Sequence, residues 1–177
     1  MAVYDIRSIS QVGTSEPFEL QLSRGQIPGH LFNHKFGYNP DIGTTPETIW
    51  TEGGLYVYPT TASTMYISSS SINDTSTGTG ARTATVSGLD ADFIPITVTV
   101  PLNGQAGVQL NGALNWYRVN RIVVNTAGSG GANAGVLYVG TEATPVGGVP
   151  TNKYATVAIG DNQTLMCIWT VPFGYTA

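Results

Sequence analysis

Two histidines are the residues best spaced for metal chemistry. His30 and His34 are four positions apart, a spacing that would place two zinc ligands on one face of a helix. Pro28, Gly29 and Gly37 surround them, and helix breakers at this density disfavour a helix. The chain has no third histidine to complete a metal shell. We therefore expect no metal and no cofactor, and histidines that hydrogen-bond within their own segment.

Two other short motifs could bind charged ligands. Asp90 and Asp92 form a D-x-D pair that could ligate calcium, but the spacing and the distal glutamate of an EF-hand are absent. The glycine-rich run at residues 128–135 lacks the Lys-Ser/Thr pair of a phosphate-binding loop. We expect a solvated hairpin tip at the first motif and a flexible hairpin loop at the second.

No catalytic group can be assembled from the sequence. There is no G-x-S-x-G motif, and two histidines among helix breakers are poor members of a catalytic triad. Eleven acidic residues could supply a carboxylate pair for glycoside cleavage, but no spacing identifies one. Cys167 lies in the apolar run 165–169, which predicts a buried, inert thiol. We therefore expect the chain not to be an enzyme.

Aromatic side chains are the remaining candidates for a functional role, because they dominate contact surfaces and also stack on sugars. Four of them are predicted to contact a partner from the N-terminal part of the chain: Phe32, Phe36, Tyr38 and Trp50. Three others could form a platform for a glycan: Tyr56, Tyr58 and Trp116. Packing in a core or an interface is the more common use of such rings.

Composition and charge exclude several classes of partner. Charged residues make up 10% of the chain, against about a quarter in average proteins, and the net charge is −4. Nucleic acid and anionic membranes both attract clustered lysine and arginine, which the chain lacks. The longest apolar runs are far shorter than the roughly 20 residues that span a bilayer. A single cysteine precludes an internal disulfide, so synthesis in a reducing cytoplasm is expected.

The elements that must position these residues are predicted to be strands. Residues 1–52 are rich in proline and glycine and are predicted to form an irregular, extended N-terminal arm with no convincing helix. Residues 53–177 alternate short β-type runs with turns, which predicts an antiparallel β-sandwich of jelly-roll or immunoglobulin-like type. The expected strands are 55–58, 64–68, 82–87, 93–100, 117–125, 136–139, 154–159 and 164–171. The polar stretch 69–80 is expected to be an exposed or mobile loop.

Two strands carry further detail. Pro95 and Pro101 remove backbone donors from the run 93–100, which predicts an edge strand. In the run 117–125 the polar residues change from one face of the strand to the other at Asn120. Arg118 and Asn120 lie on one face of a regular strand, whereas Arg121 would lie on the opposite face. A β-bulge near Asn120 would bring the apolar residues of both halves onto one face.

Several short segments resemble one group of proteins. They are HKFGYNP at 34–40, PETIW at 46–50, GGLY at 53–56, GART at 80–83, VSGLD at 86–90, LNG at 102–104, YRVNRI at 117–122 and GDNQTL at 160–165. Together they resemble uncharacterised virion-associated proteins of tailed bacteriophages, many of them marine or environmental. The resemblance extends from about residue 30 to the C-terminus. It consists of turns and strand edges and assigns no functional residue.

The resemblance implies a part on the outside of a phage particle that is made in the cytoplasm of the bacterial host. Such a part would be a capsid decoration or cement protein, a head fibre, or a tail or neck accessory. Its expected partners are other virion proteins, such as the major capsid protein or components of the tail and neck, and further copies of itself, for example in three-fold rings. The alternative is a receptor- or glycan-binding module of a tail or head fibre.

Overall fold

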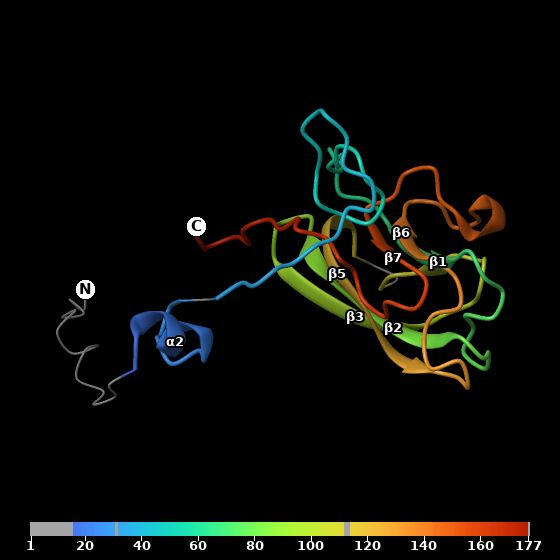
Figure 1. The fold of residues 1–177 in the computed structure, drawn as a ribbon, viewed down its shortest axis with the longest axis horizontal. Coiled ribbons are helices and arrows are strands. Elements are labelled where there is room, and N and C mark those ends of the chain that lie inside the picture. The colour runs from blue at the N-terminus through green and yellow to red at the C-terminus, as the bar shows by residue number, and fades with distance from the viewer. Residues whose placement is uncertain (1–15, 31, 112–113, 177) are drawn as a thin grey trace. The chain divides into compact units, whose positions relative to one another are not determined.

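The computed structural model describes residues 16–30, 32–111 and 114–176 (Figure 1). It divides the chain into two compact units, Met1–His34 and Lys35–Ala177. The second unit contains all the strands among the described residues.

The first unit contains a short helix, α2 (Phe18–Ser23), where the sequence predicted none. Six residues fit between two breakers. Pro17 is the N-cap, and Gly25, with φ of 68°, follows the C-cap Arg24. His30 Nδ1 hydrogen-bonds the carbonyl of Pro28 at 3.2 Å, as expected of a histidine that is satisfied within its own segment.

The second unit is an antiparallel β-sandwich, which confirms the predicted fold class. One sheet has the order β3-β2-β5, with β2 at Ala81–Asp90, β3 at Pro95–Pro101 and β5 at Trp116–Ala127. The other has the order β4-β1-β6-β7, with β1 at Tyr66–Ser69, β4 at Val108–Gln109, β6 at Leu137–Gly140 and β7 at Ala155–Val157. A 3-10 helix, η1 (Val146–Gly148), lies between β6 and β7.

The core lies between the inner faces of the two sheets. Ala84 and Val86 of β2 are fully buried, whereas Thr83, Thr85 and Ser87 alternate outward as predicted. The largest side chain that is completely buried is that of Trp116, at the start of β5. Residues of both sheets, such as Ile67, Val139, Val119 and Ile122, belong to the same buried cluster.

Both details predicted for the first sheet are confirmed. β3 pairs only with β2 and forms the edge of its sheet, where the missing donors of Pro95 and Pro101 cost little. Along β2 and β5, Ser87 pairs with Arg121 and Gly88 pairs with Val119, so Asn120 is the extra residue of a bulge. The bulge allows Val119 and Ile122 both to face the core.

Two predicted strands, 55–58 and 164–171, are instead extended segments without a ladder. Residues 164–168 still alternate, with Thr164, Met166 and Ile168 buried. Cys167 is in the other phase and is exposed, so the prediction of a buried thiol is wrong. Its neighbours are apolar, but parity and not composition decides which side chains of an extended segment face the core.

The polar stretch 69–80 is anchored around Asp74, which is fully buried. Asp74 Oδ1 accepts hydrogen bonds from the backbone nitrogens of Ala81, at 2.7 Å, and Ala134, at 2.8 Å. Its Oδ2 accepts from Ser69 Oγ, at 2.6 Å, and from the nitrogen of Gly135, at 2.8 Å. We call Asp74 and these four donors the Asp74 junction. The stretch is a loop that is exposed in part, for example at Ile72, as expected, but the carboxylate holds it in place because it satisfies the donors of four separate positions.

The glycine-rich run 128–135 packs against the same stretch. A Cβ on Gly128 would lie 2.2 Å from the carbonyl oxygen of Gly78, so the two backbones approach each other as only glycine permits. The nitrogen of Gly128 donates to the carbonyl of Gly80 at 2.7 Å. The prediction of a flexible loop is therefore corrected to a packed connection between β5 and β6.

The compact second unit begins at Lys35, 18 residues before the boundary expected at residue 53. Lys35 Nζ donates to the carbonyl of Asn120 in the bulge, at 2.5 Å, and to that of Ile168, at 2.7 Å. Burial lowers the pKa of Lys35 to about 8; the nearby Cys167 opposes this decrease and Arg121 adds to it. Residues 35–52 thus belong with the sheets.

Candidate binding surface

The surface richest in candidate contact residues is the 36–58 segment, which forms loops outside both sheets (Figure 1). Its backbone is irregular because it contains Pro40, Pro46 and two consecutive glycines, Gly53 and Gly54, that both have positive φ. An irregular segment of this length needs specific anchors to hold one conformation.

Polar anchors come from Glu47. Its carboxylate accepts hydrogen bonds from Asn39 Nδ2 at 3.0 Å, from the nitrogen of Gly43 at 3.1 Å and from that of Gly54 at 3.3 Å. These bonds, that from Asn39 foremost, lower the pKa of Glu47 below its ordinary value. Glu47 thereby closes two successive loops of the segment onto each other.

Apolar anchors come from Trp50 and Tyr56, which are both buried in the core cluster. Their rings meet edge to face at 5.0 Å, and Trp50 Nε1 donates to the carbonyl of Gly53 at 2.7 Å. The hydroxyl of Tyr56 donates to the carbonyl of Tyr154 at 2.9 Å, and burial raises the pKa of Tyr56. The segment is therefore attached to Tyr154, which directly precedes β7.

The other large apolar side chains of the 36–58 segment are exposed. Leu55 and Val57 are 71% and 75% exposed, because they alternate with the buried Tyr56. The remaining members are Phe36, Tyr38, Ile42, Ile49 and Tyr58, of which Ile42 is 69% exposed. A fixed backbone that holds this many apolar groups in solvent is typical of a contact surface.

The predicted contact residues are thus divided by the structure. Phe36 and Tyr38 are exposed on the second unit, whereas Trp50 lies in its core. Phe32 is exposed on the first unit, where its ring lies 6.3 Å from that of His34. The buried position of Trp50 makes it an anchor of the segment and removes most of its ring from contact with a partner.

The predicted glycan platform is not assembled as three exposed rings. Tyr58 is exposed, but Tyr56 is buried beneath it, with ring centroids 4.8 Å apart. Trp116 is completely buried and its Nε1 donates to the carbonyl of Leu110 at 3.3 Å. The sequence could not separate these cases, since aromatic residues are used in cores and on surfaces alike.

A cluster that the sequence did not identify surrounds Arg118. Its guanidinium carbon lies 4.2 Å from the ring centroid of Tyr117, 5.2 Å from that of Tyr58 and 5.8 Å from that of Phe93. Nη1 donates to the carbonyls of Pro59, at 2.9 Å, and Tyr117, at 2.8 Å. The only signal in the sequence was the Tyr117-Arg118 pair, because the turn after β2 brings Phe93 to it from a distant position.

The Asp90–Asp92 motif forms the tip of the β2–β3 hairpin, as expected. Asp90 Oδ1 accepts hydrogen bonds from the nitrogens of Asp92 and Ile94, both at 2.9 Å, and so organises the turn. Among the described residues, no three histidine, cysteine or acidic side chains are grouped in a way that could hold a metal ion.

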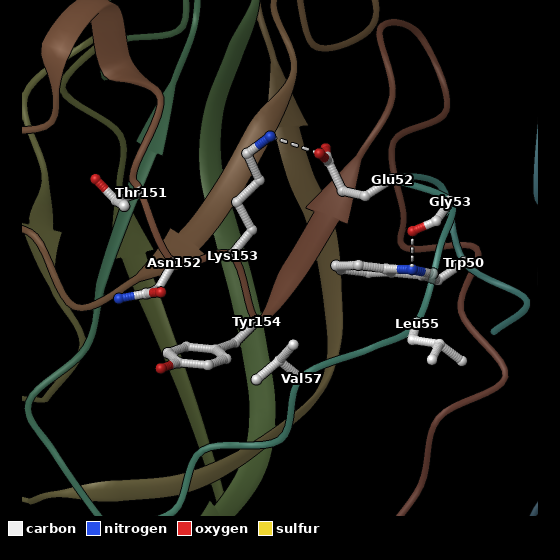
Figure 2. Close-up of a pocket in the computed structure, with 9 residues that line it drawn as sticks. All are labelled: Trp50, Glu52, Gly53, Leu55, Val57, Thr151, Asn152, Lys153 and Tyr154. Carbon is white, nitrogen blue, oxygen red and sulfur yellow. Dashed lines mark hydrogen bonds and ion pairs between the residues drawn. The ribbon is translucent and has the colours of Figure 1, made fainter. Parts of the chain in front are cut away.

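A cleft of about 320 Å³ opens beside the anchors of the 36–58 segment (Figure 2). Trp50, Glu52, Leu55 and Val57 line one side, and residues 151–154 line the other. Figure 2 shows Glu52 and Lys153 pointing toward one another, and their ion pair has an N–O distance of 2.5 Å. The Lys153 ammonium also lies 5.3 Å from the ring centroid of Tyr138.

Comparisons of the chain with family models, with curated proteins and with solved structures find no match. Within residues 16–30, 32–111 and 114–176, no helix is long and apolar enough to cross a membrane.

Proposed function

We propose that this chain is a non-enzymatic structural protein of a tailed-phage particle, either a capsid decoration (cement) protein or another component of the particle surface. It assembles by protein–protein contact with other virion proteins and with copies of itself. The phage assignment comes from the sequence resemblance, and the mode of action comes from the surface of the 36–58 segment.

One observation carries the mode of action. The 36–58 segment is fixed by Glu47, Trp50 and Tyr56, yet it leaves Ile42, Leu55 and Val57 largely in solvent. Apolar groups that are pre-positioned on a rigid frame bind a partner with little further loss of conformational entropy. The low charge of the chain supports this role, because the cores of interfaces are depleted in charged residues.

The proposal is tested on particles. Virions of the phage that encodes this chain should contain it, as detected by mass spectrometry of purified particles. Particles that lack the protein should then bind the purified full-length chain. The double variant Tyr38→Ser/Ile42→Ser should bind these particles at least about tenfold more weakly, because it lacks two exposed apolar contact residues.

The matched control is Val146→Ser/Ile159→Ser, which removes two apolar side chains that are also more than half exposed, from elsewhere on the same unit. This variant should bind as the wild type does. Absence of the chain from virions overturns the assignment to a particle. Equal binding by all three proteins overturns the role of the 36–58 segment.

A second candidate function is a receptor- or glycan-binding module of a fibre. The cleft at Trp50 and Lys153 is the observation that favours it, since the predicted platform of Tyr56, Tyr58 and Trp116 presents only Tyr58 at the surface.

A further inference from the structure

Residues 55–58 form a short stretch of extended backbone that lies outside both sheets. The stretch begins after Gly54, which has a φ of 65°, and it ends at Pro59, which has no N–H. Figure 2 shows the ribbon running from Leu55 to Val57 without a turn. The stretch has the form of a strand, but it pairs with no strand in the part of the chain that the structure describes.

One edge of this stretch has free backbone groups. In extended backbone, the N–H and C=O groups of successive residues point to opposite edges. The nitrogen of Tyr56 donates to Thr48 Oγ1 at 3.0 Å, so the N–H and C=O groups of Leu55 and Val57 point away from Thr48. Neither Leu55 nor Val57 makes a backbone hydrogen bond with any described residue. The edge therefore presents two donors and two acceptors.

The free edge is limited to Leu55 and Val57. On one side, the nitrogen of Gly53 donates to the carbonyl of Trp50 at 3.1 Å, and the carbonyl of Gly53 accepts from Trp50 Nε1 at 2.7 Å. On the other side, Pro59 has no N–H, and its carbonyl accepts from Arg118 at 2.9 Å. A partner strand therefore finds free groups at two residues only.

This edge is also accessible. Leu55 and Val57 are largely exposed, and both line the cleft of about 320 Å³, so open space lies next to them. The unpaired edge of an extended segment is a template for another strand, because its donors and acceptors match those of a second extended backbone. Exposed apolar side chains on such an edge add cross-strand contacts to the hydrogen bonds.

A second copy of the chain matches this edge in length, hydrogen bonding and polarity. In an antiparallel register centred on Tyr56, Leu55 of each copy lies opposite Val57 of the other, so each free donor meets a free acceptor. Apolar side chains then lie opposite apolar side chains, and residues 53–59 contain no charged group that would be buried. The edge of the second copy ends at the same two residues, so no backbone group of a longer strand is left over.

We propose that residues 55–58 of two copies pair as antiparallel strands across a two-fold axis. The proposal rests on the proposed assembly of the chain with copies of itself, and it identifies the backbone that makes the contact. A two-fold contact uses the same edge of both copies, so the assembly closes at a dimer through this edge. The contact is short, and the dimer is therefore weak and reversible.

The test measures the mass of the full-length chain in solution by sedimentation at concentrations from about 1 µM to about 1 mM. The average mass should rise from 18.6 kDa toward twice that value, with a dissociation constant on the order of 100 µM. The amide protons of Leu55 and Val57 should become protected from solvent exchange as the concentration rises. The amide of Tyr56 should not change, because it is already bonded to Thr48.

Val57→Pro removes one backbone donor from each copy and breaks no hydrogen bond among the described residues. It should raise the dissociation constant of the dimer at least about tenfold, because two hydrogen bonds of the pairing are lost. Val57→Thr is the matched control, since it keeps both the N–H group and the β-branched shape. This variant should dimerise within about threefold of the wild type, and both variants should unfold close to the wild-type temperature.

A chain that stays monomeric up to about 1 mM overturns the proposal. A dimer that Val57→Pro leaves unchanged forms through another surface and overturns it as well. Both failures differ from a failure of the proposed function, which is measured on particles with Tyr38→Ser/Ile42→Ser. A dimer that Val57→Pro disrupts and Val57→Thr preserves supports the pairing, whether or not particles bind the chain.

Discussion

Two irregular regions of the second unit are anchored in opposite ways. The Asp74 junction lies in a stretch of serine, threonine, asparagine and glycine, and it holds its backbone with a buried carboxylate and four hydrogen-bond donors. The 36–58 segment is rich in large apolar residues, but it buries only Trp50 and Tyr56 deeply and exposes the rest. The polar region is thus the more enclosed of the two.

The difference shows that a loop is held in place by the acceptors that its backbone N–H groups find, and not by the number of apolar residues that it contains. At the Asp74 junction a single charged acceptor reaches the beginning of β2, the end of β1 and the connection that precedes β6. Charge-assisted hydrogen bonds of this kind are the strong ones, and removal of the acceptor leaves several buried donors unsatisfied. In the 36–58 segment, the rings of Trp50 and Tyr56 and the carboxylate of Glu47 hold the backbone in place. The remaining apolar side chains are therefore available for contact with a partner.

The largest effect is expected from Asp74→Asn. An amide has one acceptor, so its NH2 group must face donors at one of the two oxygen positions. In the less damaging orientation it replaces Oδ2, where the Ser69 hydroxyl can rotate to accept but the Gly135 nitrogen cannot. We expect a loss of about 4 kcal/mol in the free energy of unfolding, measured by urea denaturation.

Asp92→Asn is the control for this change, because Asp92 is an exposed acid at a hairpin tip. Its free energy of unfolding should stay within about 0.5 kcal/mol of the wild type. If the two variants were equally stable, the Asp74 junction would not be an anchor and the contrast with the 36–58 segment would disappear.

The next largest loss of stability is expected when a buried residue of the 36–58 segment is replaced, and it is best compared with the replacement of an exposed one. Trp50→Ala removes a ring that packs in the core and on Tyr56, so it should cost about 3 kcal/mol. Leu55→Ala, five residues further on, removes a side chain that is 71% exposed and should cost less than about 0.5 kcal/mol. Thermal and urea denaturation of both variants measure the difference. Similar losses would mean that the segment is held by its exposed face as well, and the proposed contact surface would then be structural.

The sequence identified the fold where periodicity carries the information. The parity change at Asn120 located the bulge, and the two prolines located the edge strand β3. The Asp74 junction escaped prediction because its donors come from positions 69, 81, 134 and 135, and no local pattern signals such distant partners. One acid in a long polar stretch was the only available sign.

The candidate contact residues were predicted only in part for a related reason. Alternation in an extended segment places Leu55 and Val57 outside and Tyr56 inside, but Tyr58 has the same phase as Tyr56 and is exposed, so phase alone does not separate the buried rings from the exposed ones. The phase of that alternation is set by tertiary anchors such as the hydrogen bond from Tyr56 to Tyr154. The cleft also depends on such contacts, because Glu52 and Lys153 are about a hundred positions apart in the chain and meet only in the fold.

The smallest effect concerns Lys35, which attaches the beginning of the 36–58 segment to the bulge carbonyl of Asn120. Burial lowers the pKa of Lys35 in the folded state from 10.5 to about 8. Between these two values the unfolded chain binds a proton that the folded chain does not, so the free energy of unfolding rises with pH across this range. Because the side chain is only partly buried, solvent screening reduces the expected gain to about 1–2 kcal/mol.

Lys35→Met isolates this contribution, since methionine has a similar length and does not titrate. Urea denaturation at a series of pH values should show the wild type gaining stability relative to Lys35→Met from about pH 8 to pH 10.5 and no change in the difference below that range. Ionisable groups that do not interact with Lys35 are common to both proteins and cancel in the comparison. A difference that stays constant across the whole range would mean that Lys35 remains solvated. The 36–58 segment would then be held by its rings and Glu47 alone, in still sharper contrast to the charged anchor at Asp74.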